Sequence, residues 1–154
     1  MFCHKYNNKA DIIKGIQIDK PKIFISWDIT EQEFLNLFKD HNVRCVVEKM
    51  YFVKDITFFG GSNCNMGVDF TKGRCCNIGF SREYYGTGTE KEIYTRSYNS
   101  FQNAFEDVFG KPTKRSRDEI GFDNCEWEIG GKIKIYHYIM SRFGLEEHLY
   151  VEHM

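Results

Sequence analysis

Residues 124–154 read NCEWEIGGKIKIYHYIMSRFGLEEHLYVEHM. Apolar and polar side chains alternate up to the pair Gly130-Gly131, and the alternation resumes after it. Such alternation is typical of strands with one buried face, and two glycines accept the positive φ of a tight hairpin turn. After a second turn at Phe143-Gly144, Leu149 and Val151 alternate with polar residues. The stretch therefore predicts three antiparallel strands with one apolar face and one polar face.

The polar face of these strands is the candidate binding surface. If the register is as read, nine polar side chains should project from the same side of adjacent strands. They are Glu126, Glu128, Lys132, Lys134, Tyr136, Tyr138, His148, Tyr150 and Glu152. Tyrosine offers a large contact area at low entropic cost, and mixed charges supply steering and specificity, so the face suits the binding of another protein. The alternative is an ordinary exposed sheet face, on which cross-strand pairs only stabilise strand pairing.

Two amphipathic helices are predicted upstream of these strands. The capping box at residues 30–33 precedes apolar residues at helical spacing, so we expect a helix over residues 31–41. A second helix is expected over residues 101–109, where Phe, Ala and Val recur at helical spacing before Gly110 and Pro112. Each helix would have an apolar stripe to bury against a sheet.

Strand patterns account for much of the remaining chain. Residues 22–28, 43–53, 64–70 and 75–80 are rich in alternating, β-branched or aromatic residues, which indicates strands, and Thr71-Lys72-Gly73 separates the last two. We expect a further strand over Glu92–Tyr98 and a charged loop over Lys111–Glu119. The predicted fold class is α+β, with one or more antiparallel sheets and two amphipathic helices packed on one face.

We expect a single domain over residues 1–154, because no linker divides the chain. The order of strand, helix and antiparallel strands occurs twice, over residues 22–82 and 90–152. This order leads to the hypothesis of an internal duplication. The alternative is a single meander sheet with two unrelated helices.

Amino-acid composition indicates which kind of fold and which kinds of partner to expect. The 154 residues include 14 Phe and 9 Tyr against 2 Pro, which favours a sheet-rich fold with an aromatic core. Because 21 Lys and Arg nearly balance 22 Asp and Glu, the overall charge gives no reason to expect nucleic acid or a membrane as partner. The sequence shows no signal peptide or spanning segment, so we expect a cytoplasmic protein whose 6 cysteines are reduced thiols.

Patterns for catalysis and metal binding are weak. Cys64, Cys75 and Cys76 are close in sequence, but adjacent strand residues point to opposite faces and no C-x-x-C pair occurs. Carboxylates are scattered without an evident acid–base pair. We therefore expect no metal, no cofactor and no catalytic residue. The alternative is a small enzyme or ligand-binding domain that uses a pocket around His137, on the core side, with Cys125 on a neighbouring strand.

The chain resembles, in general features, the small cytoplasmic immunity proteins of bacterial polymorphic or contact-dependent toxin systems. The resemblance rests on small size, aromatic content, absence of a catalytic motif, and the residues Trp127, Gly130–Ile133 and Arg142–Leu149 near the end of the chain. It implies a non-enzymatic protein, monomeric or homodimeric, that binds and occludes a cognate toxin or effector. A structural subunit of a homo-oligomer, with its open sheet face paired with a second copy, is a further alternative.

Overall fold

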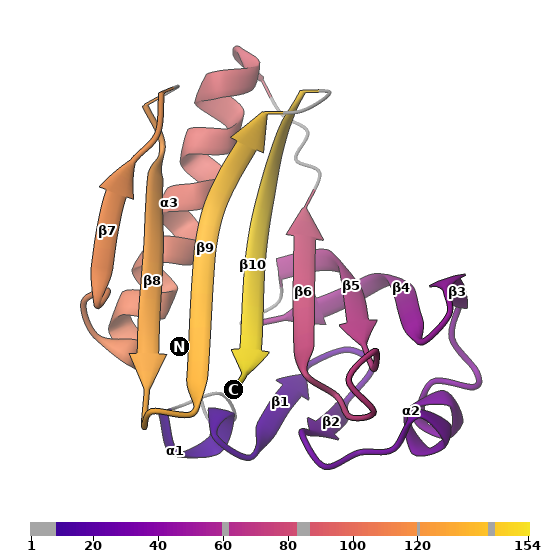
Figure 1. Cartoon of the computed structure of the whole chain (residues 1–154). Coiled ribbons are helices and arrows are strands. Elements are labelled where there is room, and N and C mark those ends of the chain that lie inside the picture. Colours follow the sequence, from indigo (N-terminus) through magenta and orange to yellow (C-terminus); the bar gives the residue numbers. More distant parts are fainter. Residues whose placement is uncertain (1–8, 60–61, 83–86, 120, 142–143) are drawn as a thin grey trace.

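The computed structural model describes residues 9–59, 62–82, 87–119, 121–141 and 144–154 (Figure 1). Its main feature is an eight-stranded antiparallel sheet with the strand order β3-β4-β5-β6-β10-β9-β8-β7, accompanied by a two-stranded sheet, β1-β2. The elements are α1 Lys9–Ile12, β1 Gly15–Ile18, β2 Ile23–Ser26, α2 Glu31–Leu37, β3 Val43–Val47, β4 Met50–Phe58, β5 Ser62–Asp69, β6 Asn77–Arg82, α3 Glu90–Phe109, β7 Lys114–Arg117, β8 Asp123–Ile129, β9 Ile133–Ser141 and β10 Leu145–His153. The predicted α+β class, with helices and antiparallel sheets, is confirmed.

The large sheet consists of two meanders of four strands, β3–β6 and β7–β10. They join through their last strands, β6 and β10, which pair antiparallel. Helix α2 precedes the first meander and α3 precedes the second. A helix followed by a meander thus occurs twice. The leading strand expected in the second unit belongs instead to α3, so the duplication over residues 22–82 and 90–152 stays a hypothesis.

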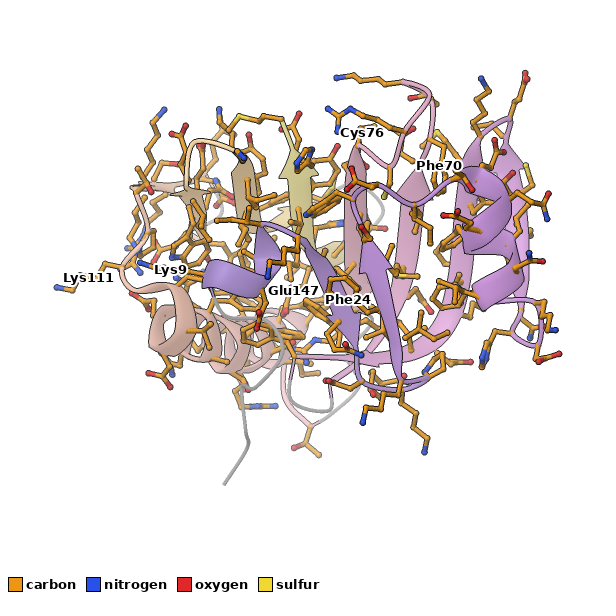
Figure 2. The ribbon with its side chains drawn as sticks, turned by 90° about the horizontal axis from the view of Figure 1, so that it is seen from below. Lys9, Phe24, Phe70, Cys76, Lys111 and Glu147 are labelled. Atoms are coloured by element: carbon orange, nitrogen blue, oxygen red, sulfur yellow. The ribbon has the colours of Figure 1, made fainter. Side chains whose placement is uncertain are left out.

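The helices and the β1-β2 hairpin lie on one side of the large sheet. Figure 2, seen from below, shows α1, α3 and the hairpin on that side. Helix α3 contacts β9 and β10, and β1 contacts β4. On α2, the buried ring of Phe34 lies 5.7 Å from that of Tyr51 and 5.6 Å from that of Phe70. The hydrophobic core fills the space between this layer and the sheet.

Aromatic side chains dominate that core, as the composition predicts. Phe105 of α3 is buried against Phe59 and Trp127. The indole Nε1 of Trp127 donates a hydrogen bond of 2.9 Å to the backbone oxygen of Gly110, which caps α3 with φ of 77°. The β8 strand is thereby tied to the end of the helix that covers it.

The strand expected over Glu92–Tyr98 was wrong, because these residues form the first half of α3. Their β-branched and aromatic residues favour strands as single residues. In the helix, however, Tyr94, Tyr98 and Phe101 fall on one buried stripe that continues to Phe105. Burial of that stripe against the sheet outweighs the local preference.

Two further boundaries differ from expectation. Helix α2 ends at Leu37 and not at residue 41, with Phe38 as its C-cap. The charged loop expected over Lys111–Glu119 contains β7, a fully exposed strand that pairs with β8. Cationic side chains are common on the edge strands of sheets, because they discourage pairing with other chains.

Candidate functional site

The face of the large sheet turned away from the helices is the candidate site, and we call it the open face (Figure 1). Eight of the nine predicted side chains share this face, in three rows of cross-strand neighbours. The rows are Glu126–Tyr136–Tyr150, Glu128–Lys134–Glu152 and Tyr138–His148. The alternation along β8, β9 and β10 therefore places these residues as predicted, while their role in binding stays a prediction.

Lys132 is the exception among the nine. It lies in the turn between β8, which ends at Ile129, and β9, which begins at Ile133. Gly130 and Gly131 have φ of 60° and 64°, the positive values expected of the two glycines. The turn is one residue longer than the glycine pair, so Lys132 borders the open face without belonging to a strand.

Neighbouring side chains hold the tyrosines of the open face in place. The rings of Tyr138 and His148 stack with centroids 5.4 Å apart, and those of Tyr136 and Tyr150 lie 6.0 Å apart. Burial, together with the nearby carboxylates, raises the pKa of Tyr150 to about 12. Its phenol therefore remains a protonated hydrogen-bond donor at neutral pH.

Charges on the same face are partly paired. Lys134 Nζ lies 3.8 Å from Glu126 Oε1, with both side chains partly exposed to solvent. His148 Nε2 lies 3.4 Å from Glu146 Oε2. An exposed ion pair such as Lys134 with Glu126 contributes about 0–1 kcal/mol to stability, so both charges remain available to a partner.

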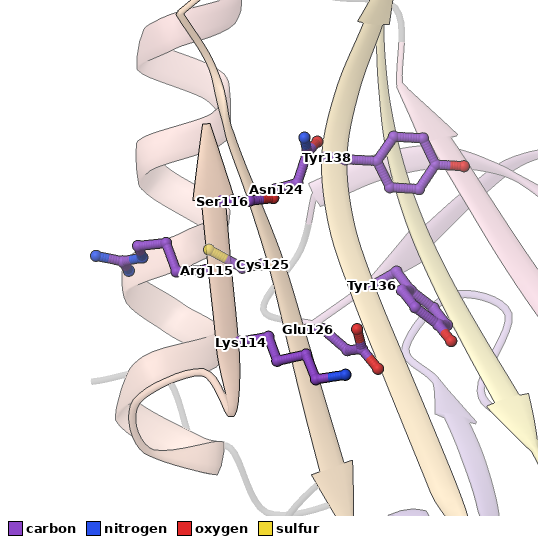
Figure 3. Close-up of a pocket in the computed structure, with 8 residues that line it drawn as sticks. All are labelled: Lys114, Arg115, Ser116, Asn124, Cys125, Glu126, Tyr136 and Tyr138. Carbon is purple, nitrogen blue, oxygen red and sulfur yellow. The ribbon is translucent and has the colours of Figure 1, made fainter. Parts of the chain in front are cut away.

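A hollow of about 510 Å³ lies at the β7-β8-β9 end of the open face (Figure 3). Its open-face lining is Lys114, Ser116, Asn124, Glu126, Tyr136 and Tyr138. In Figure 3, Lys114 extends toward Glu126, while Arg115 and Cys125 point away from the two tyrosines. Lys114 and Ser116 are outside the predicted site because residues 111–119 are expected to form a loop, and the sequence KRSR has no alternation of apolar and polar residues that indicates a strand. Asn124 belongs to a predicted strand but not to the predicted binding residues.

His137 and Cys125, the predicted alternative pocket, lie on the opposite, helix-covered face. The two residues are direct cross-strand neighbours. His137 is fully buried, with Nδ1 2.9 Å from Gln102 Oε1 and its ring stacked 4.0 Å from that of Tyr98. The Tyr98 hydroxyl lies 3.4 Å from Cys125 Sγ, to which it donates a hydrogen bond.

Beside His137 lies a buried carboxylate to which the sequence assigned no role. Glu147 accepts hydrogen bonds from Ser97 Oγ at 2.8 Å and from Arg82 at 3.2 Å, and its Oε2 lies 3.9 Å from His137 Nε2. Arg82 in turn lies over the ring of Phe101, 3.8 Å from its centroid. We call Arg82, Ser97, His137 and Glu147 the buried polar cluster.

Within the buried polar cluster, the pKa values of His137 and Glu147 are both lowered. Burial lowers the pKa of His137, and Glu147 only partly offsets this effect. Burial by itself would raise the pKa of Glu147, but hydrogen bonds and charges from His137, Arg82 and Ser97 outweigh burial and lower it. At neutral pH the cluster therefore contains a neutral imidazole, a carboxylate and a guanidinium.

The space around this cluster is small. The cavity lined by Cys64, His137, Glu147 and their neighbours measures about 10 Å³. That volume accommodates about one water molecule. Within the described residues, His137 thus has no adjoining room for a substrate or an organic ligand, and the geometry favours the open face over the pocket alternative.

The cysteines of the described residues are all free thiols, namely Cys45, Cys64, Cys75, Cys76 and Cys125. The described residues contain no group of three or more His, Cys, Asp or Glu side chains placed to hold a metal ion. Nor does the described part of the chain include a helix long and apolar enough to cross a membrane.

Comparison with known proteins adds no relative: no family model, curated protein or solved structure matches the chain. The functional argument therefore rests on the geometry of the open face.

Proposed function

We propose that the protein is a non-enzymatic protein-binding module that holds a protein partner against the open face of its sheet. The observation that carries this proposal is a set of tyrosines on a face that none of the described helices covers. Tyr136, Tyr138 and Tyr150 are held there by ring contacts. Side chains already held in place lose less entropy on binding. Glu128, Lys134 and their charged neighbours would supply orientation and steering.

Within this class, we propose an immunity or inhibitor protein that occludes a cognate toxin or effector. The support is the general resemblance to bacterial immunity proteins, which rests on small size, aromatic content and the residues Trp127, Gly130–Ile133 and Arg142–Leu149, together with the regular pairing of the strands that display the face. The six strands from β5 to β7 in sheet order pair without a register shift, so their face suits a partner that must be blocked by shape complementarity. The cytoplasmic location belongs to the same proposal.

The direct test is affinity capture with the tagged protein from a lysate of the source organism, followed by mass spectrometry. The informative variant combines Tyr138→Ala with Tyr150→Ala, because truncation of a central aromatic contact typically costs about 2 kcal/mol or more of binding, roughly thirtyfold in Kd. Phe24→Ala is the matched control, since Phe24 is a partly exposed aromatic residue in β2, on the far side of the sheet.

The proposal predicts one stoichiometric partner, retained by the unchanged protein and by Phe24→Ala and lost by the double variant. Thermal unfolding of all three proteins must remain alike. Retention of the partner by a well-folded double variant would place the interface elsewhere. Failure to capture any partner, with a purely monomeric protein by light scattering, would contradict the binding function itself.

A further inference from the structure

Two glycines in the middle of the open face are not required by the fold. Gly67 of β5 pairs directly with Gly79 of β6, and the ladder runs without a bulge on either side of them. Neither has the positive φ that favours glycine. A Cβ atom at Gly67 would meet no atom closer than 3.9 Å, and one at Gly79 none closer than 3.6 Å. Glycine weakens a strand interior and often marks a place where another molecule approaches closely.

Aromatic side chains stand on both sides of this pair, in the same row of the sheet. Phe52 of β4 pairs with Gly67, and Tyr150 of β10 pairs with Gly79. The Tyr150 ring leans toward Gly79, with Cδ2 3.6 Å from the position of a Cβ, whereas no side chain approaches Gly67 as closely. We call the space bounded by Phe52, Gly67, Gly79 and Tyr150 the glycine gap.

Negative charge borders the glycine gap on one side. The adjoining row of the sheet contains Asp69, Asn77 and Glu152. Both carboxylates raise the pKa of Tyr150, so both charges act at its ring. Within the described residues neither carboxylate forms an ion pair, although Asp69 accepts hydrogen bonds from Thr71 and Asn77.

We propose that the glycine gap is the part of the open face that receives a cationic side chain of the partner, namely an arginine. A guanidinium is flat, so it can lie against the backbone of the two glycines. It also stacks favourably on aromatic rings and forms hydrogen bonds to carboxylates. The protein already contains such stacking, because Arg82 lies 3.8 Å over the ring of Phe101 and Arg44 lies 5.7 Å from the ring centroid of Phe52. An acidic side chain or a phosphate would be repelled by Asp69 and Glu152.

This inference rests on the proposed function in one respect, because it assigns the arginine to a partner protein. The gap itself can be tested with a small probe. We would titrate ¹⁵N-labelled protein with N-acetyl-arginine amide and follow the backbone amides by NMR. N-acetyl-citrulline amide is the matched probe, because it has nearly the same shape without the positive charge.

We expect saturable shifts of the Gly67 and Gly79 amides with the arginine probe and at least tenfold weaker binding of citrulline. Gly67→Val should abolish the arginine shifts while the melting temperature stays unchanged or rises, because a Cβ atom there meets no atom closer than 3.9 Å and valine favours a strand. Asp69→Asn should weaken binding at least threefold. Asp107→Asn, which removes an exposed carboxylate from α3 on the other side of the sheet, should leave it unchanged.

Equal binding of the two probes, or shifts that map away from the glycines, would overturn the proposal. A marked loss of stability in Gly67→Val would also overturn it, because the glycine would then serve the fold. If the arginine probe fails while Tyr138→Ala with Tyr150→Ala still loses the captured partner, only the subsite is wrong. If the probe binds but no partner is captured, the subsite stands and the protein-binding function fails.

Discussion

At the scale of single residues, the carboxylate of Glu147 is a charge buried in the core of the described chain and paired with Arg82. Its side chain is 3% exposed and that of its partner Arg82 is 10% exposed. Removal of one member of a buried pair leaves the other without compensation, which typically costs about 3–5 kcal/mol. By contrast, the partly exposed pair of Lys134 and Glu126 should contribute about 0–1 kcal/mol.

We therefore expect Glu147→Gln to lower the free energy of unfolding by about 3 kcal/mol. Urea denaturation monitored by circular dichroism measures the change. Glu126→Gln is the matched control, and it should change the free energy by less than about 1 kcal/mol. Similar effects of the two substitutions would show that the buried polar cluster is not held together by charge.

His137 makes stability depend on pH in a predictable direction. Burial lowers its pKa in the folded protein below the usual value of about 6.5, so below that pH the unfolded chain binds a proton that the folded chain does not. Stability is then lost as the pH falls below about 6.5, with a limiting slope of about 1.4 kcal/mol per pH unit. The lowered pKa of Glu147 acts in the same direction, but its loss begins at lower pH, below the ordinary range of a glutamate.

The substitution His137→Phe should remove the part of this slope between pH 6.5 and 5. Urea midpoints measured at several pH values over that range provide the test, and the comparison of slopes is independent of the absolute stability of the variant. His41→Gln, at an exposed histidine four residues beyond the end of α2, is the control variant. An unaltered slope in His137→Phe would mean that His137 is not the titrating group.

Residue positions on the open face could be predicted because alternation in a strand has a period of two. The three rows containing Tyr136, Tyr138 and Tyr150 follow from that period and from the Gly130-Gly131 turn. Glu147 could not be assigned a role in the same way. Its alternation places it on the core side, but its partners Arg82 and Ser97 come from β6 and α3, and no local pattern identifies partners so far apart in sequence.

At the scale of elements, capping is the most local determinant of structure. The α2 capping box is complete: Thr30 Oγ1 accepts from the Glu33 amide at 3.1 Å, and Glu33 Oε2 accepts from the Thr30 amide at 3.1 Å. Loss of an N-cap side chain typically costs about 1 kcal/mol. The cost should appear in global stability, because Phe34 in the first turn is fully buried in the core.

We expect Thr30→Ala to lower the free energy of unfolding by about 1 kcal/mol and Thr30→Ser to leave it nearly unchanged. Gln32→Ala, an exposed position in the same turn, is the control and should have little effect. Equal stability of Thr30→Ala and Gln32→Ala in urea would mean that α2 opens independently of the rest of the fold.

Element type was harder to predict than element existence. The capping box and the Gly110 end of α3 were correctly recognised, since both signals lie within a few residues. The first half of α3 was not, because Ile93, Tyr94 and Thr95 favour a strand locally while the sheet beneath them selects a helix. The β7 strand was missed for a related reason: a short charged segment becomes a strand only when β8 offers an edge to pair with.

At the scale of the whole molecule, the function we propose depends on one asymmetry of the sheet. Helix α3 and the β1-β2 hairpin cover one face, against which Phe34 of α2 also packs, while the other face continues across all eight strands. Both meanders contribute to it, because β6 and β10 join them edge to edge. The glycine gap spans that junction, with Phe52, Gly67 and Gly79 from the first meander and Tyr150 from the second.

The sequence by itself determined the periodicity of the strands, the caps of the helices and the residues that share a face along one hairpin, because each depends on neighbours a few positions away. The tertiary structure decided which strands lie side by side. Only the pairing of β6 with β10 brings Tyr150 next to Gly79 and Arg82 next to Glu147. That pairing is selected by the burial of the whole core, a global quantity that no local pattern encodes.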